Sequence, residues 1–346
     1  MRVTQSMMTR NYMKNLNSAV GNVAKSNQRI TSGRKYTKLS ENVAEGSKAL
    51  KVREELYKNE QYVENIKTAE NELSSAESNL KSMTEILQTA QERMTKGLNG
   101  TISPSDREII AKEIRGLQDQ VLKTVNAKYG DKYLFSGTNN GGAPFKLSSD
   151  GSVLYNGFAV NDIFQKDGKY YVPGATPTDP PTLVPQNEKM FIDIGLGIKM
   201  SGDNVDPTTA FETSFSGLGI IGFGVSDSGL PNNVIGLLGT MADKLSPKPP
   251  ASYDVKKAEQ CLELLKGQTD LVVSNMTEIG TRCNFLEKTT ERIESDVLNL
   301  QGLRTRLENT NDAEETMNMK MYEYAWMATL KMGSKIIPMS LMDFIN

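Results

Sequence analysis

The sequence predicts a mainly α-helical protein with a β-rich domain inserted between two long helical stretches. Of the 28 glycines, 16 lie between residues 138 and 249, and 9 of the 13 prolines lie between residues 138 and 247. Gly and Pro interrupt helices and strands. Their distribution therefore separates a middle region of short elements from two flanks that can form long helices. Apolar residues in both flanks follow a heptad-like rhythm, and short runs with Tyr, Val and Phe alternate with turn residues in the middle.

The first flank contains apolar residues at alternating spacings of four and three. They are Tyr62, Ile66, Ala69, Leu73, Ala76, Leu80, Met83, Leu87, Ala90 and Met94. This spacing places them on one side of a helix, which is the pattern of a coiled coil. The segment GLNGTISPSD then ends the helix, and Ser103 is a good N-cap with Pro104 at the first position of a second helix. That second helix is expected to stop near Gly130.

The second flank has the same rhythm over about seven heptads, or roughly 75 Å of helix at 1.5 Å per residue. Its stripe consists of Ala258, Leu262, Leu265, Thr269, Val272, Met276, Ile279, Cys283, Leu286, Thr290, Ile293, Val297, Leu300, Arg304 and Leu307. A helix this long and narrow needs a partner to cover its apolar stripe. The helix over residues 62–94 is the obvious partner within the chain, running antiparallel. We therefore expect a helical rod formed by residues 41–137 and 230–307.

The middle of the chain, residues 138–229, is expected to form an inserted β-rich outer domain. The segments KLSSDGSVLYNGFAV and DGKYYVPGAT contain β-favouring residues between turn residues. The segment GLGIIG, residues 217–222, has the spacing of a dinucleotide-binding motif. It is followed by the turn-like FGVSDSGLPNN rather than by a helix, so we interpret it as a flexible or bulged segment without a ligand.

Both chain ends, residues 1–40 and 308–346, are predicted to be amphipathic assembly helices. Seven of the 17 methionines and the only tryptophan lie in the last thirty residues. Neither helix is long enough to be stable alone in water without a packed face. The candidate interface residues are Met13, Leu16, Val20, Val23, Ile30, Met317, Met321, Tyr324, Ala328, Met332, Ile336 and Leu341.

The Met-rich C-terminal segment allows three interpretations: the core of a helical bundle, a membrane-surface helix, or an assembly surface. A membrane-surface helix usually has a dense basic face, whereas this segment mixes three lysines with several carboxylates. Methionine is adaptable and suits a surface that meets more than one partner. The residues themselves favour the two remaining interpretations, a bundle core and an assembly surface, equally.

The composition excludes several classes of function. The chain has no histidine, the commonest general base and metal ligand. The two cysteines, Cys261 and Cys283, are expected on one helix about 33 Å apart, too far for a disulfide. The formal net charge is -2 and no basic stretch alternates with aromatics, which argues against nucleic acid. We expect no enzyme activity, cofactor, metal or small-molecule substrate, no membrane-spanning helix, and no secretory signal at the N-terminus.

Three stretches of the sequence are similar to a known family. The segments NQRITSGRKYTKLSENVAEGSKALKVREEL and LENTNDAEETMNMKMYEYAWMATLKMGSKIIPMSLMDFIN resemble the N- and C-terminal signatures of the bacterial flagellin superfamily. The segment from Gly100 to Phe145 is closest to the hook-associated members of that superfamily, as is the ending SLMDFIN. The family often has an acidic Asp-Asp-Pro turn where this chain has SENVA, so Ser40, Glu41 and Asn42 are expected to make the turn instead.

The resemblance implies a flagellin-like fold and a structural role at the bacterial flagellum. It also implies that the terminal assembly helices, residues 1–40 and 308–346, are disordered until assembled. Subunits would form a ring at the junction of hook and filament, contacting one another, a hook-side hook-associated protein, and flagellin on the filament side. Export would use the flagellar type III apparatus without a cleaved signal peptide, and a cytoplasmic chaperone would cover the C-terminal helix before export. The location would be extracellular. The alternative within the same family is flagellin itself, the filament subunit.

Overall fold

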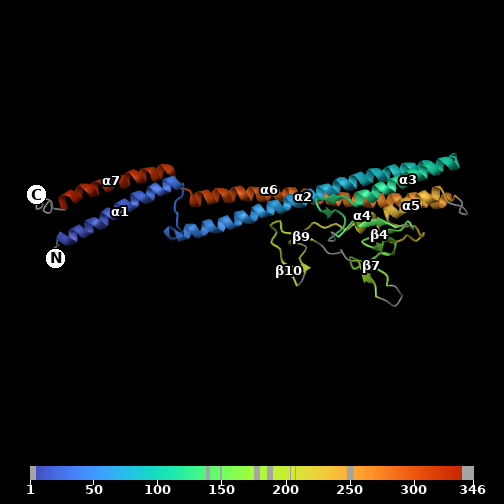
Figure 1. Ribbon diagram of the computed structural model, residues 1–346, viewed down its shortest axis with the longest axis horizontal. Helices are drawn as coiled ribbons and strands as arrows, with labels where there is room; N and C mark the ends of the chain where they lie inside the picture. The colour runs from blue at the N-terminus through green and yellow to red at the C-terminus, as the bar shows by residue number, and fades with distance from the viewer. Residues whose placement is uncertain are drawn as a thin grey trace. The chain divides into compact units, whose positions relative to one another are not determined.

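The computed structural model describes residues 5–137, 141–148, 150–174, 180–184, 190–202, 204–206, 208–247 and 253–336. The chain divides into two compact units, which are described separately below. One unit contains residues 1–60 and 294–346, and the other contains residues 61–293. Figure 1 shows that helices from the two chain ends lie side by side within a unit, which confirms the predicted pairing of N- and C-terminal helices.

Most of the described chain is helical. The α-helices are α1 (Gln5–Ser32), α2 (Val43–Leu98), α3 (Pro104–Val125), α4 (Gly217–Ile221), α5 (Val234–Leu245), α6 (Val255–Glu308) and α7 (Asp312–Ile336), with 3-10 turns η1 (Leu39–Glu41) and η2 (Val160–Asp162). The N-cap predicted for α3 is confirmed, because the Ser103 hydroxyl accepts a hydrogen bond from the Asp106 amide with Pro104 at the first position. The turn predicted at Ser40 to Asn42 overlaps η1 and its C-cap, Asn42. The Asn42 side chain accepts a hydrogen bond from the Glu45 amide at 3.1 Å and caps α2.

In the unit of residues 61–293, α2 and α6 pair in antiparallel fashion, as predicted. The stripe on α2 is buried from Ile66 to Met94, and Tyr62 is half-buried. Gln91 donates a hydrogen bond to the Thr269 hydroxyl at 2.8 Å between the two helices. The helix α3 packs against α5, and the buried Gln118 side chain donates to the Ile235 carbonyl at 2.8 Å.

The strands lie between α3 and α4, so the β insertion predicted from the Gly/Pro-rich middle is confirmed. They are β1 (Lys128–Tyr129), β2 (Lys132–Tyr133), β3 (Phe145–Leu147), β4 (Val153–Tyr155), β5 (Phe158–Ala159), β6 (Phe164–Lys166), β7 (Lys169–Val172), β8 (Thr182–Leu183), β9 (Phe191–Ile192), β10 (Met200–Ser201), β11 (Asn204–Val205) and β12 (Phe211–Glu212). The described pairings are antiparallel and form small sheets of two or three strands, such as β3-β4-β5 and β6-β7-β8.

The insertion is anchored on the helices by aromatic and polar contacts. Phe211 of β12 stacks on Phe285 of α6 with ring centroids 6.0 Å apart. Asn65 of α2 donates to the Asp193 carbonyl at 3.0 Å, which ties a loop of the insertion to the helix. The GLGIIG segment forms the short helix α4 instead of the expected flexible or bulged segment. Gly217 is required there because a Cβ would collide with the Phe145 ring, so this glycine serves packing.

Candidate assembly surface

The helices α1 and α7 pack side by side and antiparallel in the unit of residues 1–60 and 294–346, and we call them the terminal pair. Ser26 near the end of α1 donates from its hydroxyl to the Glu315 carbonyl near the start of α7, at 3.3 Å. Farther along, Tyr12 lies so close to Gly333 that a Cβ at position 333 would collide with the tyrosine ring. The two helices therefore stay together over most of their lengths (Figure 1).

The seam between α1 and α7 is small and polar. On α1 the buried and half-buried positions recur at alternating spacings of four and three, at Tyr12, Leu16, Ala19, Val23, Ser26 and Ile30. On α7 the buried positions include Glu315 and Gly333, with Met319 and Tyr322 half-buried between them. Among the described residues of these two helices, Tyr12 is the only large apolar side chain that is buried. The pair therefore buries little apolar surface within one chain.

Outside the seam, α7 carries large apolar side chains in exposed positions. We call this the outer face, and it consists of Met317, Met321, Tyr324, Met327, Leu330 and Met332. The exposed fraction reaches 69% for Met317 and 70% for Tyr324. A row of exposed apolar side chains along a helix marks an interaction surface. The chain thus presents on α7 the kind of surface that another helix or subunit covers.

The predicted interface residues divide into two groups in the structure. Leu16, Val23 and Ile30 are half-buried on the seam with α7, whereas Met13 and Val20 are exposed. The predicted α7 residues lie together away from the seam, and they are Met317, Met321, Tyr324, Ala328 and Met332. Ile336 is the last residue of α7, and its side chain lies outside the described part, as does the whole of Leu341.

Sequence reasoning missed the seam residues Tyr12, Ser26, Glu315 and Gly333. Their spacing carries the signal, because Tyr12 and Ser26 fall in the same alternating rhythm as Leu16 and Val23. An apolar-only search passes over serine, glutamate and glycine, so it selects the more apolar outer face of α7 instead of the seam.

An elbow joins the terminal pair to the ends of α2 and α6, and we define it as residues 33–42 and 309–311. Its two segments are held together by backbone hydrogen bonds, from the Lys35 amide to the Glu308 carbonyl at 2.7 Å and from the Thr310 amide to the Gly33 carbonyl at 3.0 Å. Arg34 and Asn309 form an antiparallel bridge between them. This short ladder places the exit from α1 beside the entry to α7.

An ion pair with two hydrogen bonds stabilises the elbow from the side of α2. The Arg53 guanidinium donates from Nε to Glu308 Oε1 at 2.5 Å and from Nη2 to Glu308 Oε2 at 2.6 Å. The Glu308 side chain is nearly buried, whereas Arg53 is about half exposed. The hydrogen bonds from Arg53 lower the pKa of the Glu308 carboxyl below its usual 4.5.

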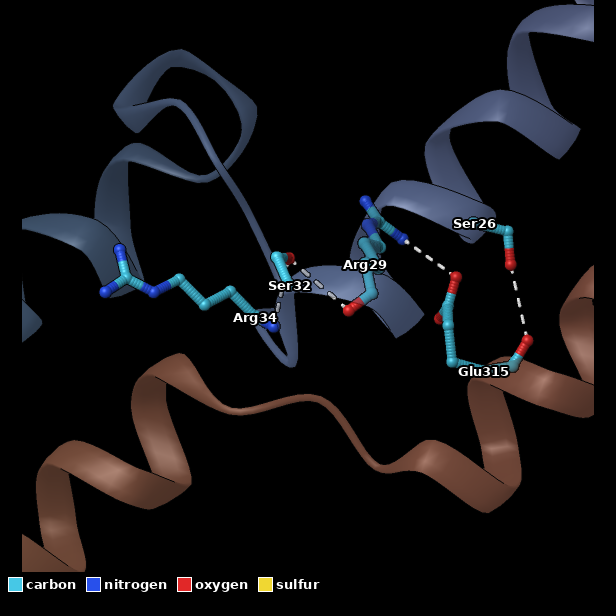
Figure 2. Close-up of polar contacts among 5 residues, drawn as sticks. All are labelled: Ser26, Arg29, Ser32, Arg34 and Glu315. Atoms are coloured by element: carbon cyan, nitrogen blue, oxygen red, sulfur yellow. Dashed lines mark hydrogen bonds and ion pairs between the residues drawn. The ribbon is translucent and has the colours of Figure 1, made fainter.

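A hollow of about 300 Å³ lies at the elbow. Its charged lining consists of four carboxylates and two cations, from Glu41, Glu45, Glu314, Glu315, Arg29 and Lys35. Figure 2 shows the Glu315 carboxylate pointing from α7 towards Arg29 on α1, with Oε1 and Nη1 3.8 Å apart. That distance is longer than a hydrogen bond, and Glu315 Oε1 is buried without a hydrogen-bond partner. The Tyr36 hydroxyl, which also lines the hollow, is buried and unpartnered as well.

Burial and nearby carboxylates both affect the Tyr36 hydroxyl at the elbow. Burial, followed by the carboxylates of Glu308 and Glu45, raises the pKa of the Tyr36 hydroxyl above its usual value. No group of three His, Cys, Asp or Glu side chains that could hold a metal ion occurs within the described ranges. Likewise, no described helix is long and apolar enough to cross a membrane.

In this architecture, helices from both chain ends pair around an inserted β region. Residues 3–140 match the family described as the bacterial flagellin N-terminal helical region. The resemblance noted in the sequence is thereby confirmed for this part of the chain.

Two curated proteins are similar to the chain, and each is a flagellar hook-associated protein 3. The one from Escherichia coli strain K12 is 27% identical over 289 residues, which cover 83% of this chain and 81% of the relative. The one from Salmonella typhimurium is 29% identical over 152 residues, which cover 44% of this chain and about half of the relative, 48%. A solved structure from Vibrio parahaemolyticus, described as a flagellar hook-associated protein, has 20% identity and a TM-score of 0.59, and the match covers 78% of this chain and 100% of that one. The similarity to this solved structure supports the fold described above.

Proposed function

We propose that this chain is a structural subunit of the bacterial flagellum, the third hook-associated protein, which forms the junction between hook and filament. The observation that carries the proposal is the terminal pair, whose seam buries little apolar surface while its outer face exposes several large apolar side chains. The similarity to flagellar hook-associated protein 3 over 83% of the chain supports the proposal. The protein is a structural component and has no enzymatic role.

The mechanism is burial of the outer face during assembly. Each large apolar side chain that leaves water contributes about 1.5–3 kcal/mol. Ordering two helices costs about 1–2 kcal/mol per residue, and the small polar seam of a single chain offsets only part of this cost. Residues 1–40 and 308–346 therefore fold stably only against neighbouring copies, a hook-associated protein on the hook side and flagellin on the filament side. The β-rich residues 138–229 form the outer part of the subunit.

The protein is extracellular and reaches the junction through the flagellar type III apparatus. In the cytoplasm, an export chaperone covers the outer face of α7 and prevents premature association.

Immunogold electron microscopy of whole cells tests the location. An epitope inserted at the exposed β6-β7 turn, near Lys166 and Lys169, leaves the helices unchanged. A narrow band of label between hook and filament is the expected result. Label along the whole filament would instead identify the chain as flagellin, the alternative in the same family, and label confined to the cytoplasm would contradict both assignments.

Limited proteolysis of the purified chain tests folding upon assembly. We expect trimming of roughly the first 40 and last 40 residues and survival of the remainder. Chain ends that resist protease before assembly would contradict this step, while leaving the location at the junction to be judged by microscopy.

A further inference from the structure

The hollow at the elbow has the chemistry of a receptor for a basic side chain. The Lys35 Nζ donates to the Arg306 carbonyl at 2.5 Å, so one of its three N–H donors is already engaged by backbone. Glu315 is only 7% exposed, and its Oε1 lacks a hydrogen-bond partner. A buried carboxylate oxygen without a hydrogen-bond donor is costly. Arg29 contacts this oxygen only as an ion pair at 3.8 Å, so the site can accept a further N–H donor.

The size and arrangement of the hollow favour an extended cation. A hollow of about 300 Å³ exceeds the roughly 30 Å³ share of one water molecule several times. The described residues bring no three carboxylates close enough for a metal ion. The end of a lysine or arginine side chain fits both the volume and the need for N–H donors.

The N-terminal segment of the chain is a source of such side chains. The first 40 residues contain eight lysines and arginines and no aspartate or glutamate. On α1, Arg10 and Lys14 are exposed and lie on either side of Tyr12, which packs beside Gly333. Residues 324–336 of the adjacent helix contain no carboxylate side chain. The neighbouring part of α7 therefore offers these two cations no acidic partner.

We propose that the turn of α1 containing Arg10 and Lys14 in one copy of this chain inserts a basic side chain into the elbow hollow of a second copy. The inference rests on the proposed function, since it requires copies to assemble side by side. Along α1, Lys14 and Arg10 lie 15 and 19 residues from Arg29 at the hollow, or about 22–29 Å at 1.5 Å per residue. The two copies are consequently shifted along the helix axis by about that distance, so charge complementarity sets their register.

Charge reversal in the full-length chain tests the contact. Lys14→Glu and Glu314→Lys, each alone, are expected to weaken self-association about tenfold, as measured by sedimentation velocity at low salt. The double variant is expected to recover most of the association, because the two charges again attract. Glu314 is exposed on the rim of the hollow, so its replacement leaves the buried Glu315 in place. Lys67→Glu on α2 is the matched control for net charge and is expected to change little.

Photo-crosslinking locates the contact independently of affinity. With Lys14 replaced by p-benzoylphenylalanine, the expected crosslinks between copies reach peptides that contain Glu41 to Glu45 or Thr310 to Glu315. Labelled chains that associate but crosslink elsewhere, or reversals without mutual rescue, would overturn this inference and leave the proposed function intact. A wild-type chain that neither self-associates nor joins the hook–filament junction would overturn both.

Discussion

Two antiparallel helix pairs in this molecule differ in how much apolar surface they bury within the chain. In the unit of residues 61–293, the pairing of α2 with α6 buries Ile66, Leu80 and Leu87 completely. In the other unit, the terminal pair α1 and α7 buries Tyr12 but otherwise places small or polar groups on its seam, while the outer face of α7 stays exposed. Both pairs follow a heptad-like rhythm, so the rhythm alone does not separate them.

The pair α2 and α6 is stabilised by burial within the chain, whereas the terminal pair depends on a partner to bury its apolar side chains. A coiled-coil seam filled with leucine, isoleucine and methionine is stable by itself. A seam with serine, glutamate and glycine holds two helices in register but provides little free energy. The predictions below test this contrast, beginning with the largest expected change in stability.

Leu87→Ala is expected to destabilise the unit of residues 61–293 by about 2–5 kcal/mol, because it removes a completely buried side chain and leaves a cavity. Urea unfolding followed by circular dichroism measures this loss. The matched control is Met321→Ala on the outer face of α7, where the side chain is 56% exposed. Equal losses for the two variants would remove the distinction between the pairs.

Gly333→Ala is expected to weaken the terminal pair by about 1–3 kcal/mol, since the new Cβ collides with the Tyr12 ring. Hydrogen exchange on α1 and α7 measures the effect directly in the assembled state. Gly302→Ala on α6 is the control, because a Cβ there meets no atom within contact distance. This control is expected to stabilise its helix by up to about 1 kcal/mol. Unchanged exchange in the Gly333 variant would mean that the seam contact is absent in the assembly.

Glu308→Gln is expected to cost about 1–2 kcal/mol at the elbow. The replacement removes the charge from two short hydrogen bonds with Arg53, and the half-exposed position of Arg53 limits the loss. Hydrogen exchange of residues 33–42 reports on this region. If hydrogen exchange at the elbow is the same in the variant as in the wild type, the backbone hydrogen bonds alone hold the two segments together.

The same ion pair predicts acid sensitivity. The folded-state pKa of Glu308 lies below its usual 4.5 because Arg53 donates to the carboxylate. The resulting stabilisation is fully present above about pH 4.5 and is lost as the pH falls through the lowered folded-state pKa. Glu308→Gln removes this contribution, so the difference in stability between wild type and variant is expected to shrink below pH 4.5. A difference that stays constant down to pH 2 would contradict the assignment.

The sequence predicts the fold class well because large apolar residues dominate the α2 and α6 stripes and the glycines and prolines concentrate between them. It predicts the terminal seam poorly, for a physical reason. On α7 the seam contains Glu315 and Gly333, which no apolar pattern selects, and the stronger stripe of methionines faces away from α1. The ion pair between Arg53 and Glu308 joins residues 255 positions apart, so no local spacing signals it.

Replacing Met317 and Tyr324 together by serine is expected to have the smallest effect on the isolated chain and a large effect on assembly. Both side chains are more than two-thirds exposed, so the stability of the chain is expected to change by less than about 0.5 kcal/mol. In the assembled state each large side chain contributes about 1.5–3 kcal/mol by burial, so incorporation at the junction is expected to fall by at least about tenfold. Electron microscopy of labelled junctions measures incorporation, and urea unfolding measures stability. Normal incorporation of this variant would mean that the outer face of α7 stays in water after assembly, and the contrast between the two helix pairs would then have a cause other than partner binding.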